Sequence, residues 1–264
     1  APRFFDYDND GDLDAFVGSQ DWGSPSQPWL IRNDGDWTFT DVSQPTMDIG
    51  NHYYASAAVA DHDRDGDLDY FTVMGAWTDA KLFQNDAGTF NDASATYGIS
   101  VGGGNTGKHG VWIDIDRDHD LDLFALNHWN ATGGWLFRND TDSGNWLEVV
   151  PQPTRSNRSR FGTRVEVFWE GQSQIQYYEE SLNDFPESFS KTKFFGLGAA
   201  ATVDSVVVYW AAGTRRTVTD VAANQVLEIQ ESDVLTVDDV SIVCADVVDT
   251  VRVSVSLTAP TGAI

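Results

Sequence analysis

The sequence predicts an all-β protein in which partial or complete β-propeller-like repeats precede an antiparallel β-sandwich-like domain. Three observations lead to this prediction. An acidic segment recurs in steps of 55 and 53 residues, from Asp6 to Asp61 and from Asp61 to Asp114. Each copy is followed by an apolar run that ends in Asn-Asp, and helical periodicity is weak throughout the chain. Repeats of about fifty residues with about four short strands each are typical of propeller blades.

The composition excludes several classes of protein. The 264 residues include 16 Lys and Arg against 41 Asp and Glu, which gives a formal net charge of -25. Such a surface repels phosphate backbones, so we expect no nucleic-acid partner. The single cysteine, Cys244, excludes an intrachain disulfide. No apolar run approaches the roughly 18 residues of a membrane-spanning helix, so we expect no membrane span.

Aspartate is concentrated in the three repeated segments, DYDNDGDLD, DHDRDGDLD and DIDRDHDLD. Residues 1–147 contain 25 Asp and no Glu, and 15 of these Asp lie in the three nine-residue segments. Acid that served only solubility would use both residue types. The placement therefore indicates a local purpose for these side chains.

Alternate Asp side chains of a tightly turning loop converge on one point, where a hard cation with six to eight oxygen ligands fits. Calcium is the expected ion, at about three sites. Within each nine-residue loop, the Asp residues at positions one, three and five are expected to donate carboxylate oxygens. The Asp at position seven is expected to donate its backbone carbonyl, and the Asp at position nine closes the shell. The predicted metal ligands are Asp6, Asp8, Asp10, Asp12 and Asp14 in the first loop, Asp61, Asp63, Asp65, Asp67 and Asp69 in the second, and Asp114, Asp116, Asp118, Asp120 and Asp122 in the third.

His119 occupies the position of the turn glycine in the third loop. We expect strain there, because a residue other than glycine would have to adopt a positive φ. An EF-hand would require a bidentate Glu at the twelfth position, where Val17, Thr72 and Ala125 stand instead, and helical flanks, where the sequence is strand-like. Metal-free Asx-turns on a solvated face remain as the alternative to calcium.

The segment after each acidic loop predicts a β-hairpin. The three copies are WLIRNDGDWTFTD, KLFQNDAGTFND and WLFRNDTDSGNW, in which Asn33, Asn85 and Asn139 each precede an Asp. An apolar run, then Asn-Asp, then a second aromatic-rich run is typical of two strands with a tight turn. Each repeat is thus expected to contain a strand that leaves the acidic loop, a hairpin and a fourth strand.

The pattern changes near residue 144. Glu appears, the acidic loops stop, and the alternating runs TRVEVFWE and VDSVVVYW predict longer antiparallel strands. We therefore expect three domains or segments: calcium-binding repeats over residues 1–144, a β domain over 145–232, and a C-terminal β tail over 233–264. In the tail, the alternating segment VRVSVSLT predicts one more strand.

These motifs resemble a known combination of families. The acidic loops resemble FG-GAP or VCBS repeats, the calcium-binding blades of integrin-α-type propellers. The second region is similar to the ASPIC/UnbV domain that follows such repeats in cartilage acidic protein and in bacterial secreted proteins. The matching segments are Asn145-Trp146-Leu147, SNRSRFGTRVEVF, Phe195-Gly196-Leu197-Gly198 and VDSVVVYWAAG. The resemblance covers about residues 4–231.

Two features depart from the family pattern. Trp210-Ala211-Ala212-Gly213 stands where the family usually has Trp-Pro-Ser-Gly. Propellers close with about four to eight blades, whereas this sequence has three acidic loops. Either the chain is a fragment of a longer one, or three blades pack without closing a ring.

The resemblance implies a non-catalytic, calcium-binding extracellular or cell-surface module for adhesion or self-association, with calcium making the loops rigid. Its expected partners are a second copy, arranged head to tail, or an extracellular protein or glycan. The first alternative is a structural subunit of a filament or surface layer, in which the tail strand Val251–Thr258 adds to a neighbour's sheet. A carbohydrate-active enzyme or lectin is the lesser alternative, because no catalytic motif was found and the Asp residues are already assigned to calcium.

Overall fold

The computed structural model describes residues 2–18, 28–47, 56–73, 80–100, 107–127, 134–140, 144–156, 158, 160–178, 192–231, 236–244 and 251–258. Strands predominate among these residues, and none of them lies in an α-helix. The one helical element among them is a short 3-10 turn, η1 (Pro45–Met47). The all-β prediction is confirmed, and no described helix has the length and hydropathy needed to cross a bilayer.

The first two repeats each form a four-stranded antiparallel sheet whose strands lie in sequence order. We call these sheets blade 1 and blade 2. Blade 1 consists of β1 (Pro2–Phe5), β2 (Asp14–Val17), β3 (Trp29–Asn33) and β4 (Phe39–Asp41). Blade 2 consists of β5 (Ser56–Ala60), β6 (Asp69–Val73), β7 (Lys81–Asp86) and β8 (Thr89–Asp92). In both, the acidic loop joins the first strand to the second.

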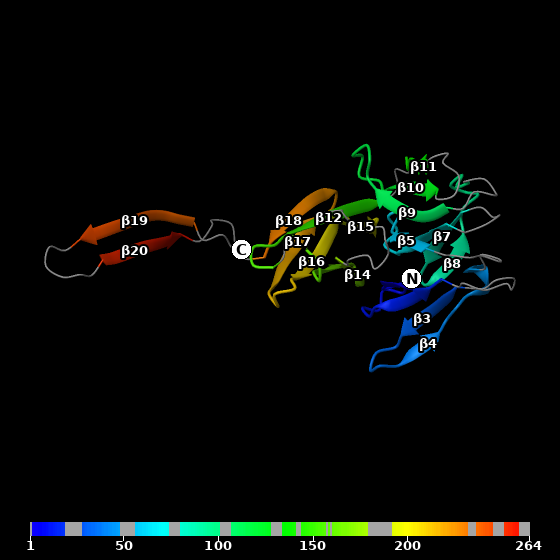
Figure 1. The fold of residues 1–264 in the computed structure, drawn as a ribbon, viewed down its shortest axis with the longest axis horizontal. Coiled ribbons are helices and arrows are strands. Elements are labelled where there is room, and N and C mark those ends of the chain that lie inside the picture. Colours follow the sequence, from blue (N-terminus) through cyan, green and yellow to red (C-terminus); the bar gives the residue numbers. More distant parts are fainter. Residues whose placement is uncertain are drawn as a thin grey trace.

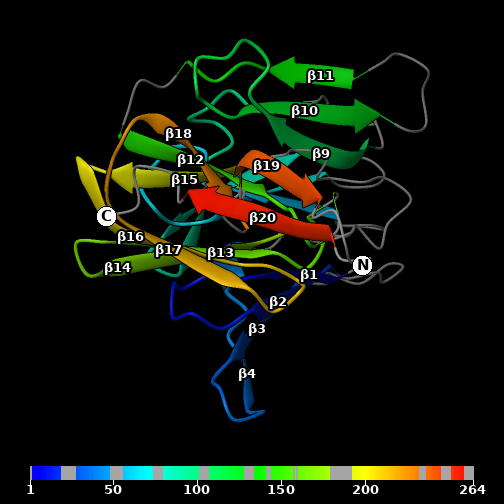
Figure 2. The same ribbon diagram turned by 90° about the vertical axis from the view of Figure 1, so that its left-hand side faces the viewer.

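Blade 3 contains three described strands, β9 (Gly107–Ile113), β10 (Asp122–Asn127) and β11 (Gly134–Phe137), with the third acidic loop between β9 and β10. Figure 1 shows blade 2 between blade 1 and blade 3, and Figure 2 shows blade 3 and blade 1 on opposite sides of the molecule. The four-strand repeat is thus complete in two copies and shortened among the described strands of the third.

The predicted hairpins form in blades 1 and 2. In blade 2 the turn is Ala87-Gly88, with φ of 48° and 84°, between paired residues Asp86 and Thr89. Two positive φ values in a two-residue loop are typical of a type I′ turn, whose twist matches that of the flanking strands.

The third hairpin prediction was wrong. The run that begins at Asn145 does not pair with β11; it forms β12 (Asn145–Gln152), which pairs with β15 (Lys193–Gly198) and β18 (Gln225–Gln230). The physical reason is burial: Trp146, Leu147, Val149 and Val150 are all buried in this position.

Each joint between blades is a hydrophobic layer. Phe5, Phe16 and Leu30 from blade 1 pack against Tyr70 and Phe83 from blade 2. The next joint contains, from blade 2, Ala58, Phe71 and Leu82 and, from blade 3, Leu123 and Ala125. Successive side chains of a strand point to opposite faces, so blade 2 uses one face for each neighbour.

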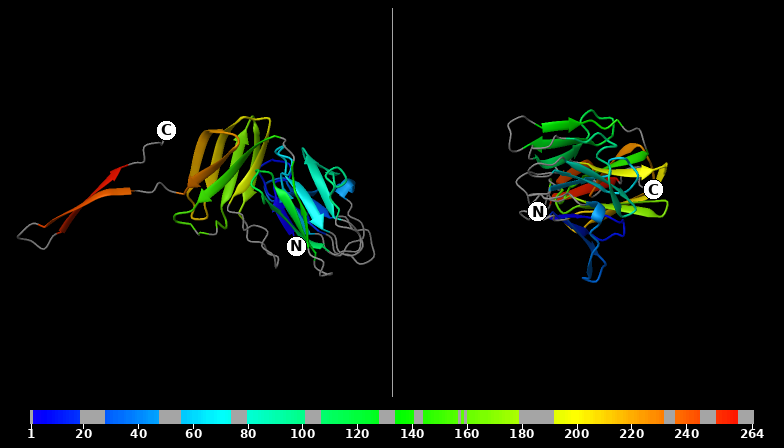
Figure 3. Two further views of the ribbon diagram at one scale, coloured as in Figure 1. Left: turned by 90° about the horizontal axis from the view of Figure 1, so that it is seen from above. Right: turned by 90° about the vertical axis from the view of Figure 1, so that its right-hand side faces the viewer.

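The second region is a two-layer β sandwich (Figure 3). One layer has the order β15-β12-β18. The other has the order β14-β13-β16-β17, formed by β14 (Gln172–Tyr177), β13 (Arg164–Trp169), β16 (Thr202–Tyr209) and β17 (Arg215–Ala222). The two long strands that the sequence predicts are present as β13 and β16, and they pair antiparallel with each other. The β12–β18 pair is parallel, so the sandwich is mixed rather than wholly antiparallel.

The tail segment forms β19 (Thr236–Cys244) and β20 (Val251–Thr258), which pair antiparallel with each other. The predicted strand at 251–258 is therefore present. Its partner in this chain is β19, and Figure 1 shows this hairpin apart from the sandwich and blades.

Glu231, which follows β18, fastens the end of the sandwich. Its carboxylate accepts hydrogen bonds from the backbone N–H groups of Thr154 (2.9 Å), Arg155 (2.6 Å) and Ser156 (2.7 Å). The hydroxyls of Ser156 and Thr214 also donate to it, at 2.7 and 2.8 Å. Burial alone would raise the pKa of Glu231, but these donors outweigh it and lower the pKa from 4.5 to about 2.

We expect Glu231→Gln to destabilise the sandwich by about 2–4 kcal/mol at pH 7, because several hydrogen bonds to a charged acceptor are weakened. The lowered pKa belongs to the folded state, so the carboxylate stabilises the fold above pH 4.5 and loses this effect as the pH falls toward 2. The denaturant midpoints of the unaltered protein and of Glu231→Gln at pH 7, 4 and 2.5 measure the difference in stability between them. A difference that does not shrink with falling pH contradicts the assignment.

Candidate metal centres

The backbone of each acidic loop is folded around its first Asp. Asp6 accepts the N–H groups of Asp10 and Gly11, both at 3.0 Å, and Asp61 accepts that of Gly66 at 3.0 Å. In the third loop Asp114 accepts the N–H of His119 at 3.2 Å. The sixth residue has a positive φ in every loop, 97° at Gly11, 100° at Gly66 and 70° at His119. The positive φ predicted at His119 is therefore present.

The Asp residues at positions one, three and five of the loop converge in two of the three loops. Carboxylate oxygens of Asp6, Asp8 and Asp10 lie within 4.8 Å of one another, and the same holds for Asp61, Asp63 and Asp65. The third loop instead gathers Asp114, Asp116 and Asp122, while Asp118 is exposed and accepts the N–H of Asp120 at 3.0 Å. Three loops of one sequence pattern thus present three groups of carboxylates.

In the first two groups, burial and mutual repulsion disfavour ionisation of all three carboxyl groups at once. Burial raises the pKa of Asp6 to about 7, with further increases from Asp10, Asp14 and Asp8. Burial likewise raises the pKa of Asp65 to about 7, and it raises that of the fully buried Asp61 well above its usual value of 3.8. Asp61 Oδ1 and Asp8 Oδ1 are buried and accept no hydrogen bond. A cation would satisfy these oxygens and offset the repulsion, so the donor set fits calcium.

The Asp at position nine of each loop has a structural role that sequence reasoning missed. Asp14 joins the N–H of Tyr7 (3.0 Å) to that of Asn33 (2.8 Å), which ties the loop to the following hairpin. Asp69 and Asp122 repeat both contacts, with Asn85 and Asn139 in the place of Asn33. The Asn-Asp motif is therefore the attachment point of the acidic loop as well as a turn signal.

The Asp at position seven of the second and third loops connects neighbouring blades. Asp67 Oδ1 accepts a hydrogen bond from Asn9 Nδ2 of the first loop at 2.8 Å. Asp120 forms an ion pair with Arg64 of the second loop, and both side chains are 6% exposed. Asn9 and Arg64 are the fourth residues of their loops and have positive φ values of 57° and 62°. The side chains of Asp67 and Asp120 are thus committed to the blade joints. Coordination of an ion by their backbone carbonyls stays a prediction.

The sandwich rests on all three acidic loops. Gln174 Nε2 donates to the Gly66 carbonyl at 2.8 Å, and the His119 ring stacks on Trp146 at 4.0 Å between centroids. A Cβ built on Gly11 would lie 3.9 Å from Ile175.

The closest approach is at Gly196, where a Cβ would lie 2.0 Å from Asp61 Oδ2 and 2.5 Å from the Arg64 Cα. Only glycine fits there, because any side chain would overlap the second loop. The Phe195-Gly196-Leu197-Gly198 motif is therefore the docking point of the sandwich on the acidic loops.

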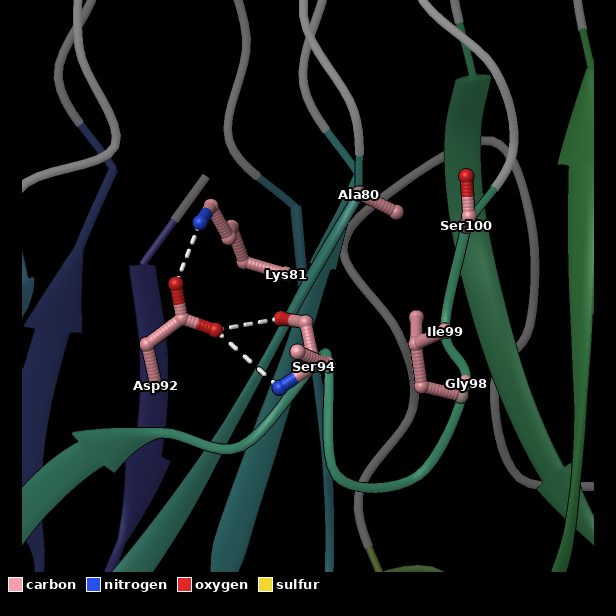
Figure 4. A pocket seen from close by; sticks show the side chains of 8 residues that line it. Ala80, Lys81, Asp92, Ser94, Gly98, Ile99 and Ser100 are labelled. Atoms are coloured by element: carbon pink, nitrogen blue, oxygen red, sulfur yellow. Dashed lines mark hydrogen bonds and ion pairs between the residues drawn. The ribbon is translucent and has the colours of Figure 1, made fainter.

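A shallow pocket lies away from the loops, on blade 2 (Figure 4). Its volume is about 460 Å³, and Lys81, Asp92, Ser94 and Ile99 are among its lining residues. Asp92 forms an ion pair with Lys81 and accepts hydrogen bonds from the Ser94 N–H and hydroxyl. Because these polar groups satisfy one another, the pocket offers a ligand little beyond surface contact.

Comparison with protein families agrees with this geometry. The FG-GAP-like repeat family matches residues 6–72, which span the first two acidic loops. The ASPIC and UnbV family matches residues 153–236, which lie mostly in the sandwich. The chain contains an FG-GAP-like repeat region and an ASPIC/UnbV domain. No curated protein matches it.

The FG-GAP match ends before blade 3, yet the third loop repeats the backbone contacts of the first two. The ASPIC/UnbV match begins after β12, yet β12 lies at the centre of one sandwich layer. Both units therefore extend in space beyond the matched residues. Together they form a β-propeller-type module.

Proposed function

We propose that this FG-GAP repeat protein is a non-catalytic, calcium-binding extracellular module that serves adhesion or self-association. The observation that carries the proposal is the group of carboxylates in the second loop, above all the buried Asp61, whose Oδ1 has no hydrogen-bond partner. Asp61, Asp63 and Asp65 would hold one ion, with the Asp67 carbonyl and Asp69 completing the shell. The first and third loops would hold the other two.

Calcium would act structurally in this module. It would remove the mutual repulsion of the carboxylates and fix the loops on which the sandwich rests. Gly66, Asp61 and His119 belong to the loops and also contact the sandwich or lie against it. Ion binding would therefore make both the blades and the domain interface rigid, and a rigid surface binds a partner at a lower entropic cost.

An extracellular location supports this use of the loops, because extracellular calcium modules bind in the range of roughly 10⁻⁴–10⁻³ M, where the ion is permanently available. The absence of catalysis is part of the proposal. It is supported by the assignment of the acidic side chains to ions and blade joints, and by the paired polar groups of the blade 2 pocket.

Isothermal titration of chelator-treated protein with calcium tests the proposal. We expect uptake of about three ions, and about one fewer for Asp61→Asn, which removes a ligand charge without changing the side-chain volume. The matched control is Asp204→Asn, an exposed carboxylate in the sandwich, which should leave the stoichiometry unchanged. Absence of calcium uptake by the unaltered protein would refute the proposal.

A further inference from the structure

The third acidic loop differs from the other two at position six, where His119 replaces the glycine. The backbone of His119 is left-handed, with φ of 70°, a conformation that glycine adopts without steric cost and histidine does not. In the first two loops this position faces apolar side chains: a Cβ on Gly66 would lie 2.9 Å from Trp169, and a Cβ on Gly11 would lie 3.9 Å from Ile175. In the third loop the side chain at position six meets a carboxylate of the sandwich instead.

The imidazole ring of His119 is oriented by two residues of the sandwich strand β12. Its Nδ1 lies 2.8 Å from Glu148 Oε1. Its ring stacks on that of Trp146, with 4.0 Å between the centroids and 17° between the planes. Trp146 and Glu148 are alternate residues of one strand, so both face the loop. The stacked indole therefore holds the imidazole with Nδ1 directed at the carboxylate.

Asp114 brings a third donor to the same point. The ligand atoms of Asp114, His119 and Glu148 lie within 4.8 Å of one another. A tetrahedral zinc ion with bonds of about 2.0–2.2 Å places its ligand atoms about 3.3–3.6 Å apart, so a small closure of this group suffices. One imidazole nitrogen and two carboxylate oxygens suit zinc, whereas calcium takes oxygen ligands alone. The side chain of His119 is 37% exposed, which provides an entry path and a fourth position for water.

We propose that Asp114, His119 and Glu148 bind one Zn²⁺ ion at the junction of blade 3 and the sandwich. Two ligands come from the acidic loop and one from β12, so the ion cross-links the two domains. Asp114 also belongs to the carboxylate group with Asp116 and Asp122. Its two oxygens allow it to serve the zinc ion and a calcium ion of the third loop together. The zinc site goes beyond the proposed function and does not depend on calcium binding.

The described residues contain one other group that combines an imidazole with carboxylates, around His62 in the second loop. His62 is 4% exposed, and its Nδ1 lies 2.6 Å from Asp69, inside the proposed calcium shell. This imidazole is closed to the solution. We therefore assign zinc to His119, and the variants below separate the two groups.

Competition with a chromophoric zinc chelator, in saturating calcium, measures zinc binding by the full chain. We expect one zinc ion per chain. His119→Gly should weaken zinc binding by roughly 100-fold or more, because the loss of even an outer-shell partner of a metal site costs about 10–100-fold. The same variant should take up as much calcium as the unaltered protein, since glycine occupies this position in the first two loops. A folding defect would lower the uptake of both ions.

Glu148→Gln tests the ligand that the sandwich supplies and lies outside the loop. It should weaken zinc binding by roughly tenfold or more, because a neutral amide is a poorer ligand than a carboxylate. The matched control is Glu228→Gln, an exposed residue on the neighbouring strand β18, which should leave zinc binding unchanged. Co²⁺ in place of zinc adds a spectroscopic readout: we expect visible d–d absorption in the unaltered protein and in Glu228→Gln, and its loss in His119→Gly.

Two results would overturn the inference: no zinc uptake in the presence of calcium, or equal zinc affinity of the unaltered protein and both His119→Gly and Glu148→Gln. The second result would assign the ion to His62 or to the acidic loops alone. If His119→Gly also lowers calcium uptake, the comparison of Glu148→Gln with Glu228→Gln decides. Calcium is titrated separately, so failure of the zinc site is distinguished from failure of calcium binding.

Discussion

Withdrawal of calcium should lower the melting temperature of the blades by about 15–30 °C. An ion present at about 100 times its Kd stabilises the folded state by about 2.7 kcal/mol, so three such sites contribute about 8 kcal/mol. For a chain of this size each kcal/mol corresponds to about 2–4 °C. The direction follows from the crowded carboxylates of the loops, which repel one another without an ion and would be neutralised by a bound cation.

Differential scanning calorimetry in millimolar calcium and in excess EGTA measures this effect. The sandwich supplies an internal control, because its core contains no acidic loop and its transition should move less than that of the blades. Substitution of magnesium for calcium should recover only part of the stability, since magnesium demands a small octahedral shell and dehydrates reluctantly. Equal melting temperatures with and without calcium would contradict the structural role of the ions.

Arg64→Ala should destabilise the joint between blades 2 and 3 by about 3–5 kcal/mol. The guanidinium is buried against Asp120, and its removal leaves a buried carboxylate without its partner. Arg64 also donates to the Gly144 carbonyl at 3.4 Å and lies over the Phe194 ring at 6.0 Å, so the sandwich loses contacts too.

Chemical denaturation at a concentration where the chain is monomeric measures this loss. Arg117→Ala is the matched control: it has the same loop position and left-handed backbone but an exposed side chain, and we expect a change within about 0.5 kcal/mol. Asp120→Asn combined with Arg64→Ala should recover part of the stability, because it removes the unpaired charge. If both Arg variants behave alike, the buried ion pair does not hold the joint.

Much of the fold was readable in the sequence because it depends on local patterns. The spacing of the acidic loops predicted the blades, and the Asn-Asp motif predicted two of the hairpins. The replacement of glycine by His119 indicated a positive φ. These features involve residues close in sequence, where backbone sterics and short-range hydrogen bonds decide the conformation. The convergence of Asp6, Asp8 and Asp10 belongs to the same class.

Other features required partners that no local pattern reveals. The run after Asn139 has the composition of a hairpin strand, but it is buried between β15 and β18 instead of pairing with β11. Glu231 reads as an ordinary charged residue, yet it binds backbone N–H groups more than 70 residues away in the chain. The residues at position four of the loops are Asn9, Arg64 and Arg117. The sequence shows this alignment, but only the packing of neighbouring blades shows that Asn9 and Arg64 bind the next loop.

The sequence by itself thus determined the all-β class and the carboxylate groups of the acidic loops, because strands and loops arise from residues close together in the chain. It also determined the repeat, because the same loop pattern recurs at a nearly constant spacing. The tertiary structure decided which side chains join the blades and why Gly196 must be glycine against Asp61. The physical reason is that burial and ion pairing act between segments 50 to 130 residues apart, and their free energy depends on packing that a linear pattern does not contain.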